Sequence, residues 1–589
     1  MDFPRDTALM IAGLDSWPYA KSGNSENIIY EERLQARLRV SHFRLPAEYD
    51  GTGKTKIPAV RFPRWHYCPS SKCKKMEKVN LFKGDKILYC RYCEKERNKK
   101  VRLIPVRFVT VCPNGHIDDF PFDEWVHAFS ERSPDHNHTL MYTAGNSSTL
   151  AGIKITCTCG AWRNMRDAFD RSVFERMGLQ CSGQRPWFGQ VDGDYGCGEP
   201  IQTAQRGASN IYFPAVYSSI YLPLWGEKVE RRIVDVLEDP EIWAYLTCSL
   251  EDGEIARHTC DAIAIAKKIN SEKLYRAAVK KLRGTDEEDV DDEGFRYAEY
   301  EAFLNERGDE NTDLFVSKHS AQEYDDWMEE FFSNVVLIKK LRETRALAGF
   351  TRLIPSGELD AAGQEDRLQP IKLSSQVSWL PAVIVRGEGI FLEFNEESLD
   401  KWLNETSTTQ GVERLIRDFN SKRAEKGIPP VEHDAKYFLL HTFAHSIIRQ
   451  LCFECGYGSA ALRERIYCDR SNPDNKMQGV LIYTAAGDSE GTMGGLVRQG
   501  EPGTGRIEKA IRKALQDSLW CAADPVCIES PGQGTGTSNL AACHNCCLLP
   551  ETSCEQGNRF LDRALLIGRP SDKQSGFFSV LFQDQEEAI

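Results

Sequence analysis

The sequence predicts an α+β protein, a multidomain mosaic with small cysteine-rich modules near its beginning, a helical middle region and an α/β domain at its C-terminal end. Three observations lead to this prediction. The chain has 589 residues, too many for one hydrophobic core, and 41% of them are hydrophobic. Nine of the 20 cysteines lie between positions 61 and 200. Elsewhere, apolar runs typical of strands alternate with apolar residues at helical spacing.

Changes in composition divide the sequence into four parts. These are an N-terminal segment (1–60), a cysteine-rich region (61–200), a mixed strand and helical region (201–430) and a C-terminal domain (431–589). Residues 61–107 form a basic ribbon with 15 lysines and arginines and only 4 acidic residues, whereas 284–313 is an acidic stretch. Although the formal net charge of the chain is −13, this basic segment is therefore suited to binding phosphate groups.

The apolar patterns also predict the individual elements. Helical spacing predicts helices over 26–40, 242–250, 263–269, 327–347 and 506–520, and helices dominate 412–470. Apolar and β-branched runs predict strands over 106–111, 378–394 and 479–487, and a strand pair broken at prolines over 209–223.

The basic ribbon contains the first candidate metal site. Cys68 and Cys73 are separated by sixteen residues from Cys90 and Cys93, so two close cysteine pairs flank a hairpin. Four thiolates on two tight turns fit tetrahedral zinc without an open position, which is typical of a structural zinc ribbon. We find no signal peptide and no run of 18 apolar residues, so we expect a cytoplasmic protein. In that compartment clustered cysteines bind metal more often than they form disulfides.

Further cysteines and histidines form looser groups of candidate zinc ligands. A second quartet beside glycines and turns consists of Cys157, Cys159, Cys181 and Cys197. A candidate third site, for which a solvated polar turn is the alternative, consists of Cys112, His116, His127 and His138. The predicted quartet of the C-terminal zinc-binding domain consists of Cys527, Cys543, Cys546 and Cys554. Cys521 competes for its fourth position, and Cys547 is expected to be a packed thiol. We expect two to four structural zinc ions, held partly by zinc-ribbon-like modules.

Two motifs resemble functional signatures but lack an essential part. GTGKT at 51–55 has Glu48 where a P-loop requires its first glycine. His441 and His445 share a helix face, but Thr442 stands where a zinc hydrolase carries its general base. We therefore expect core or interface histidines there, and a protein that is not an enzyme.

The cations of the basic ribbon are the candidate DNA contacts, which would be independent of sequence and sensitive to salt. They are Arg61, Arg64, Lys72, Lys74, Lys75 and Arg91. Two alternatives remain. One is an adaptor whose basic face meets an acidic partner. The other is a metal-dependent nuclease or hydrolase that uses the mixed Cys/His stretch or Asp488 and Glu490.

Several motifs together resemble one known family. They are RFPRWHYCP (61–69), CPNGHIDDFPFDEWVH (112–127), GASNIYFPAVYSSIYLP (207–223), LLHTFAHSIIRQL (439–451), GDSEGTMGGL (487–496) and AACHNCCLLPETSCEQGNRFLDRALLIG (541–568). In these residues the chain resembles the DrmB family, core components of the bacterial antiphage system DISARM, and its C-terminal part resembles a domain of MrfA-type helicases.

The resemblance implies a partner-dependent role. DrmB-like proteins associate with DrmA, a helicase-like ATPase, in a hetero-complex that binds DNA. The resemblance also implies that the family's cysteines correspond to Cys68, Cys73, Cys90, Cys93, Cys543, Cys546 and Cys554. We therefore expect a non-catalytic, zinc-stabilised subunit that binds a helicase-like ATPase and assists DNA engagement.

Overall fold

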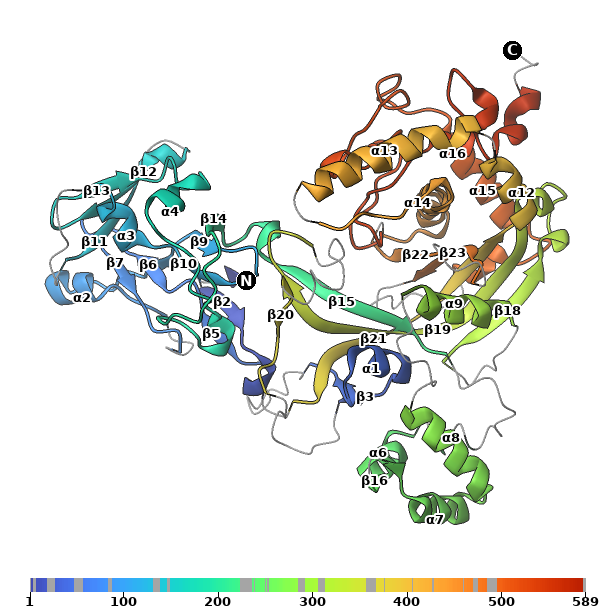
Figure 1. Ribbon diagram of the computed structural model, residues 1–589, viewed down its shortest axis with the longest axis horizontal. Coiled ribbons are helices and arrows are strands. Elements are labelled where there is room, and N and C mark those ends of the chain that lie inside the picture. Colours follow the sequence, from blue (N-terminus) through green and yellow to red (C-terminus); the bar gives the residue numbers. More distant parts are fainter. Residues whose placement is uncertain are drawn as a thin grey trace. The chain divides into compact units, whose positions relative to one another are not determined.

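A computed structural model shows a chain of mixed helices and sheets, which confirms the predicted α+β class (Figure 1). The residues that it describes are 2–3, 7–17, 27–46, 57–82, 87–130, 138–145, 149–222, 233, 236–237, 239–248, 250–251, 254–283, 292–305, 313–355, 367–374, 377–404, 406–425, 428–458, 460–469, 475–484 and 495–585. The GTGKT motif, Asp488 and Glu490 lie outside these ranges.

The chain forms two compact units, and each combines segments that are distant in the sequence. Unit 1 comprises residues 1–28, 44–217 and 347–381. Unit 2 comprises residues 29–43, 218–346 and 382–589. The division into four parts by sequence position stays a prediction.

Unit 1 consists of small antiparallel sheets of three strands each. Their strands, in sheet order, are β1 (Asp2–Phe3), β2 (Thr7–Ile11) and β5 (Ala59–Arg61); β7 (Met76–Lys78), β6 (Trp65–Tyr67) and β8 (Ile104–Pro105); β10 (Ile117–Asp119), β9 (Phe108–Val111) and β14 (Gln202–Gln205); and β11 (Leu140–Ala144), β12 (Ile153–Cys157) and β13 (Trp162–Asn164). Its helices are α2 (Arg91–Arg97), α3 (Phe122–His127) and α4 (Ser172–Arg176). With strands of two to five residues, each sheet buries little apolar surface of its own.

Unit 2 is built on a larger sheet with the strand order β15-β19-β21-β23-β22. The bounds of these strands and of those that pair beside them are β15 (Phe213–Ile220), β19 (Phe332–Thr351), β21 (Trp379–Phe394), β23 (Gln478–Thr484), β22 (Leu462–Cys468), β18 (Phe315–Ser320), β20 (Gln369–Pro370), β3 (Ile28–Ile29) and β4 (His42–Arg44). The ends of β15, β19 and β21 belong to unit 1, as do β20 and parts of β3 and β4. The expected strand pair over 209–223 is wrong, because the structure forms the single strand β15 there.

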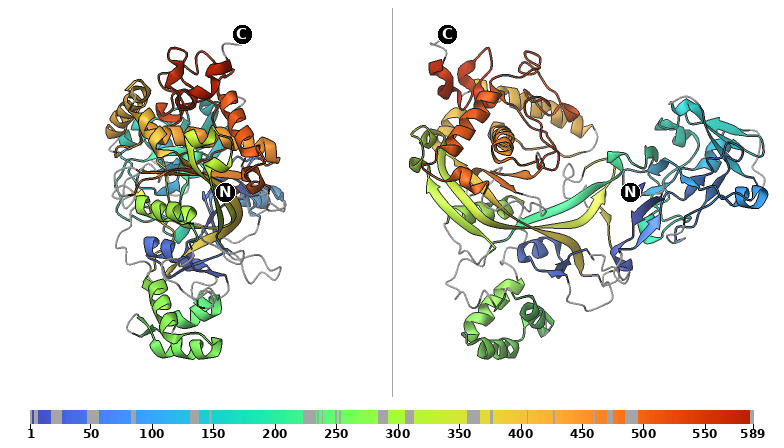
Figure 2. Two further views of the ribbon diagram at one scale, coloured as in Figure 1. Left: turned by 90° about the vertical axis from the view of Figure 1, so that its right-hand side faces the viewer. Right: turned by 180° about the vertical axis from the view of Figure 1, so that it is seen from behind.

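Helices cover both faces of this sheet (Figure 2). The helices of unit 2 are α1 (Glu32–Leu38), α6 (Pro240–Cys248), α7 (Arg257–Lys267), α8 (Ser271–Arg283), α9 (Asp292–Leu304), α10 (Met328–Phe331), α12 (Glu396–Leu403), α13 (Thr406–Ala424), α14 (Ala435–Cys455), α15 (Arg506–Ser518) and α16 (Ala564–Ile567), with a short ribbon of β16 (Leu250–Glu251) and β17 (Glu254–Ile255). On one face α14 and α15 enclose the largest core of the described residues. On the other face α9 closes a second, aromatic core.

The predicted helix over 327–347 is wrong. Only the short helix α10 forms, and the long strand β19 follows it at once. Val335 and Leu337 point into the core with α14, whereas Val336 and Ile338 point into the core with α9. A strand buried on both faces reads as a continuous apolar run, which periodicity cannot distinguish from a buried helix.

A buried ion pair ties α9 to the sheet. The Nε and Nη2 groups of Arg465 donate to the Glu299 carboxylate at 2.7 and 2.8 Å. The Tyr467 hydroxyl donates to the same carboxylate at 3.0 Å. Glu299 is fully buried. Burial opposes its ionisation, but the charges of Arg465, Arg33 and Arg296 together outweigh burial and hold the pKa of Glu299 below its ordinary value.

We expect Arg465→Met to lower the free energy of unfolding by about 3–5 kcal/mol, because it removes the cation that lies nearest to a buried carboxylate. Urea unfolding followed by fluorescence measures this loss. Arg463→Met is the matched control. Arg463 is half-buried on the same strand and its guanidinium donates to the Thr552 carbonyl, so we expect a loss of about 1 kcal/mol or less. Equal losses in the two variants would contradict the importance of the ion pair.

Candidate metal centres

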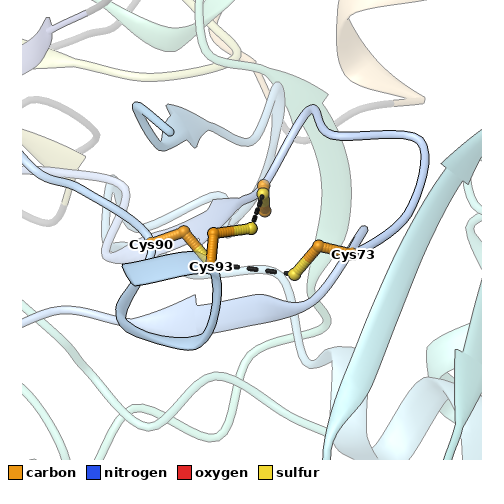
Figure 3. A group of neighbouring side chains, drawn as sticks. Cys73, Cys90 and Cys93 are labelled. Carbon is orange, nitrogen blue, oxygen red and sulfur yellow. Dashed lines mark hydrogen bonds between the residues drawn. The ribbon is translucent and has the colours of Figure 1, made fainter. Parts of the chain in front are cut away.

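The basic ribbon brings its four cysteines together. Cys68 follows strand β6, and its N–H donates to the Lys75 carbonyl, which closes the first turn. Cys90 precedes helix α2 and Cys93 lies in its first turn. Figure 3 shows Cys73, Cys90 and Cys93 directed toward one another. All four sulfur atoms lie within 4.8 Å of one another, as two tight turns at the ends of a hairpin require.

The sulfur separations fit a tetrahedral zinc site. Cys68 Sγ is 3.6 Å from Cys93 Sγ, and Cys73 Sγ is 3.7 Å from Cys90 Sγ. Zinc–sulfur bonds of about 2.3 Å place the sulfur atoms of a tetrahedron about 3.8 Å apart. A disulfide would require about 2.05 Å, and all 20 cysteines are free. The donor set therefore suits a closed zinc site.

A second four-donor cluster joins two separate stretches of unit 1. Cys112 and His116 flank the tight turn between β9 and β10, where Gly115 has φ +79°. Two backbone hydrogen bonds bring Cys181 and Cys197 together. The Cys181 N–H donates to the Glu199 carbonyl, and the Gly198 N–H donates to the Cys181 carbonyl. The four donor atoms of Cys112, His116, Cys181 and Cys197 lie within 4.8 Å of one another.

This arrangement corrects two predicted groupings. The structure separates Cys157 and Cys159 from Cys181 and Cys197, and places them with His127 instead. His127 therefore does not share a site with Cys112, and His138 lies beside it, with ring centres 5.4 Å apart. The Nε2 of His138 lies 2.7 Å from Asp123 Oδ1. The physical reason is that α3 packs against strands β12 and β13, which carries His127 to the turn after β12.

The group around His127 contains three donors among the residues that the structure describes. Cys159 Sγ lies 3.4 Å from His127 Nε2. Cys157 ends β12, and the Cys159 N–H donates to its sulfur at 3.5 Å. Three protein donors leave one position of a tetrahedral metal free, in contrast to the other clusters.

The C-terminal quartet consists of Cys521, Cys527, Cys543 and Cys546. Cys521 Sγ is 3.5 Å from Cys543 Sγ, and Cys527 Sγ is 3.7 Å from Cys546 Sγ, so these distances also fit zinc. Cys554 was expected in this quartet and does not belong to it, because Cys521 occupies the fourth position. The expected packed thiol, Cys547, is 1% exposed and belongs to none of the metal-ligand groups among the described residues.

The predicted DNA contacts differ in exposure. Arg61 and Arg64 are buried, at 4% and 6% exposure, which does not favour their predicted contact with DNA phosphate. The Arg64 guanidinium donates to Asp119 at 2.9 Å and to Asp192 at 2.5 and 2.6 Å. Hydrogen bonds from Arg64 hold the pKa of Asp192 well below its ordinary range.

The remaining candidates lie around the ribbon. Lys72 and Arg91 are exposed, and Lys74 and Lys75 are half-buried. The Lys75 ammonium lies 4.0 Å from the centre of the Tyr92 ring and 3.4 Å from Glu96. Sequence reasoning missed further exposed cations on and after α2, namely Lys95, Arg97, Lys99 and Lys100.

Among the described residues, we find no helix with the length and apolar character needed to cross a membrane.

Two family descriptions and one relative match this chain. Residues 1–213 match a domain of unknown function, DUF8724, and residues 443–547 match the MrfA Zn-binding domain. The DISARM protein DrmB of Bacillus paralicheniformis is 30% identical over 588 residues, which cover 99% of this chain and 100% of that protein. Together with the cysteine clusters, the second match indicates structural zinc sites in this chain.

Zinc content tests the cluster that joins distant stretches of unit 1. We expect Cys112→Ser, Cys197→Ser and the double variant each to lose one zinc per chain, because both cysteines are assigned to the same ion. Native mass spectrometry of the folded protein counts the ions. Cys248→Ser is the control, since Cys248 is exposed and outside the clusters of the described residues. A double variant that loses two ions would support the grouping predicted from the sequence.

Proposed function

Because this chain belongs to the DrmB family of DISARM proteins, we propose that it is a zinc-stabilised, non-catalytic subunit of a bacterial antiphage complex. In this complex it binds a helicase-like ATPase (DrmA) in the cytoplasm and helps that partner to engage DNA. The zinc ions hold small modules in shape, the ATPase supplies the energy, and the basic ribbon supplies contacts to phosphate.

We assign structural zinc ions to three closed donor sets. They are Cys68, Cys73, Cys90 and Cys93; Cys112, His116, Cys181 and Cys197; and Cys521, Cys527, Cys543 and Cys546. Four protein donors leave no position for a substrate or a reactive water, which supports a structural role. Zinc binding in small modules contributes roughly 10–16 kcal/mol, enough to fold sheets that bury little apolar surface.

The observation that carries the DNA proposal is the cluster of cations on the metal-held ribbon. Lys72 lies between Cys68 and Cys73, and Arg91 lies between Cys90 and Cys93, so the metal site fixes the backbone of both residues. Lys74 and Lys75 follow directly on the same turn. Cations held by a rigid scaffold pay little entropy when they meet phosphate, and such contacts are independent of base sequence.

A second candidate function rests on the three donors His127, Cys157 and Cys159. A metal held by these three would keep one open position, which is the arrangement of catalytic zinc sites. A metal-dependent nuclease or hydrolase centred on this group is therefore the alternative to a purely structural protein.

We expect reversing the four cations Lys72, Lys74, Lys75 and Arg91 to glutamate to weaken DNA binding of the DrmA complex by roughly tenfold or more at low salt. The slope of log affinity against log salt should become shallower, because fewer counterions are released. Fluorescence anisotropy with a labelled duplex across a salt series measures both quantities.

The control variant replaces four exposed cations on other helices with glutamate, namely Lys267, Lys273, Arg414 and Arg417. It changes the net charge of the protein by the same amount. Its DNA affinity should stay close to that of the natural protein. Undiminished affinity in the ribbon variant, with its zinc content intact, would contradict the proposed surface. Zinc-dependent DNA cleavage by the chain alone that Cys159→Ser abolishes would favour the hydrolase alternative.

A further inference from the structure

A second group of metal donors lies inside unit 2, apart from the cysteine quartet. His441 and His445, four residues apart on α14, have ring centres 4.7 Å apart. Both rings face Glu464 on β22: His441 Nε2 is 2.9 Å from Oε1, and His445 Nε2 is 3.4 Å from Oε2. Cys554 Sγ completes the group at 3.2 Å from His441 Nε2. Cys554, which is not part of the cysteine quartet, therefore lies with His441, His445 and Glu464.

The group is buried in a way that ordinary core packing does not explain. His441 and His445 are 0% exposed, Glu464 is 2% exposed and Cys554 is 9% exposed. Within the part of the chain that the structure describes, His445 Nε2 and Glu464 Oε2 have no hydrogen-bond partner although both are buried. Buried polar atoms without partners are costly, and they are rare in folded proteins. Both atoms point toward the centre of the same group.

The position of His441 Nε2 suggests what the centre holds. It lies close to the Glu464 carboxylate and to the Cys554 sulfur at the same time. One N–H cannot direct itself well at two acceptors, whereas one nitrogen lone pair and two anionic ligands can all converge on a cation. A divalent ion would balance one carboxylate and one thiolate, so the buried group would have no net charge.

Neighbouring hydrogen bonds orient the donors as they do in metal sites. His445 Nδ1 lies 2.8 Å from the Cys547 carbonyl, and an N–H at Nδ1 leaves the Nε2 lone pair directed inward. The backbone N–H groups of Gln556 and Asn558 donate to Cys554 Sγ at 3.3 and 3.2 Å. Such bonds stabilise a thiolate, the form of cysteine that binds metal.

We propose that His441, His445, Glu464 and Cys554 bind a structural zinc ion. Imidazole, carboxylate and thiolate are all zinc ligands, and four of them complete a tetrahedron with no open position. His441 and Cys554 lie outside the region that matches the MrfA Zn-binding domain, whereas the cysteine quartet lies entirely within it. The ion cross-links α14, β22 and the segment after Pro550. This inference goes beyond the proposed function and does not depend on it.

The first test uses the natural chain, so that it does not depend on any variant folding. Anomalous diffraction from crystals of the full chain, collected above and below the zinc absorption edge, locates zinc directly. We expect a peak between the four donors that disappears below the edge. No peak there, with a peak present at the cysteine quartet, would overturn the proposal. A peak that persists below the edge would overturn zinc in favour of another metal.

The second test compares two buried thiols of the same segment, Cys554 and Cys547. We expect Cys554→Ala to lose one zinc per chain, whereas Cys547→Ala retains the full number, as counted by native mass spectrometry. Glu464→Gln keeps the shape of the side chain and removes its charge, so we expect its zinc to exchange at least tenfold faster with a chelator. A folded Cys554→Ala variant with an unchanged zinc count would overturn the site.

Discussion

Coordination of metal by thiolate is the constraint on which the basic ribbon depends. The ribbon sheet has three short strands, and the apolar residues beside the ribbon cysteines are only a few, among them Val79, Leu88 and Leu103. Cores of this size do not offset the conformational entropy of the chain. Metal bonds supply the folding free energy that apolar burial does not provide in the ribbon. They therefore determine where its cysteine-bearing turns lie.

Unit 2 is stabilised mainly by the burial of apolar side chains. Its sheet carries apolar side chains on both faces, and α14 fills the centre of one core, with nearly every residue from Ala435 to Leu451 buried. On the other face, the Glu299–Arg465 pair sits among aromatic rings. The donors His441, His445 and Glu464 are buried beside this core, on α14 and β22.

Sequence reasoning predicted the features that local geometry decides. Cys68, Cys73, Cys90 and Cys93 could be grouped because two tight turns and one hairpin bring them together. The partners of Cys112 could not be identified, because the approach of Cys197 depends on how distant strands pair. Likewise, β19 reads as a helix because both of its faces are buried. The burial of Arg64 depends on Asp119 and Asp192, which no count of charges reveals.

Phe577 and Phe578, close to the end of the chain, pack against Phe331 and Phe394 at the centre of unit 2. The sheet strands that they cover are therefore synthesised long before their own core can close. Until then the part of β19 and β21 around Phe332 and Phe394 lacks its apolar cover, which favours aggregation of a nascent chain. The contacts that complete this core join residues more than 180 positions apart, and contacts of such high sequence separation are the slowest to form.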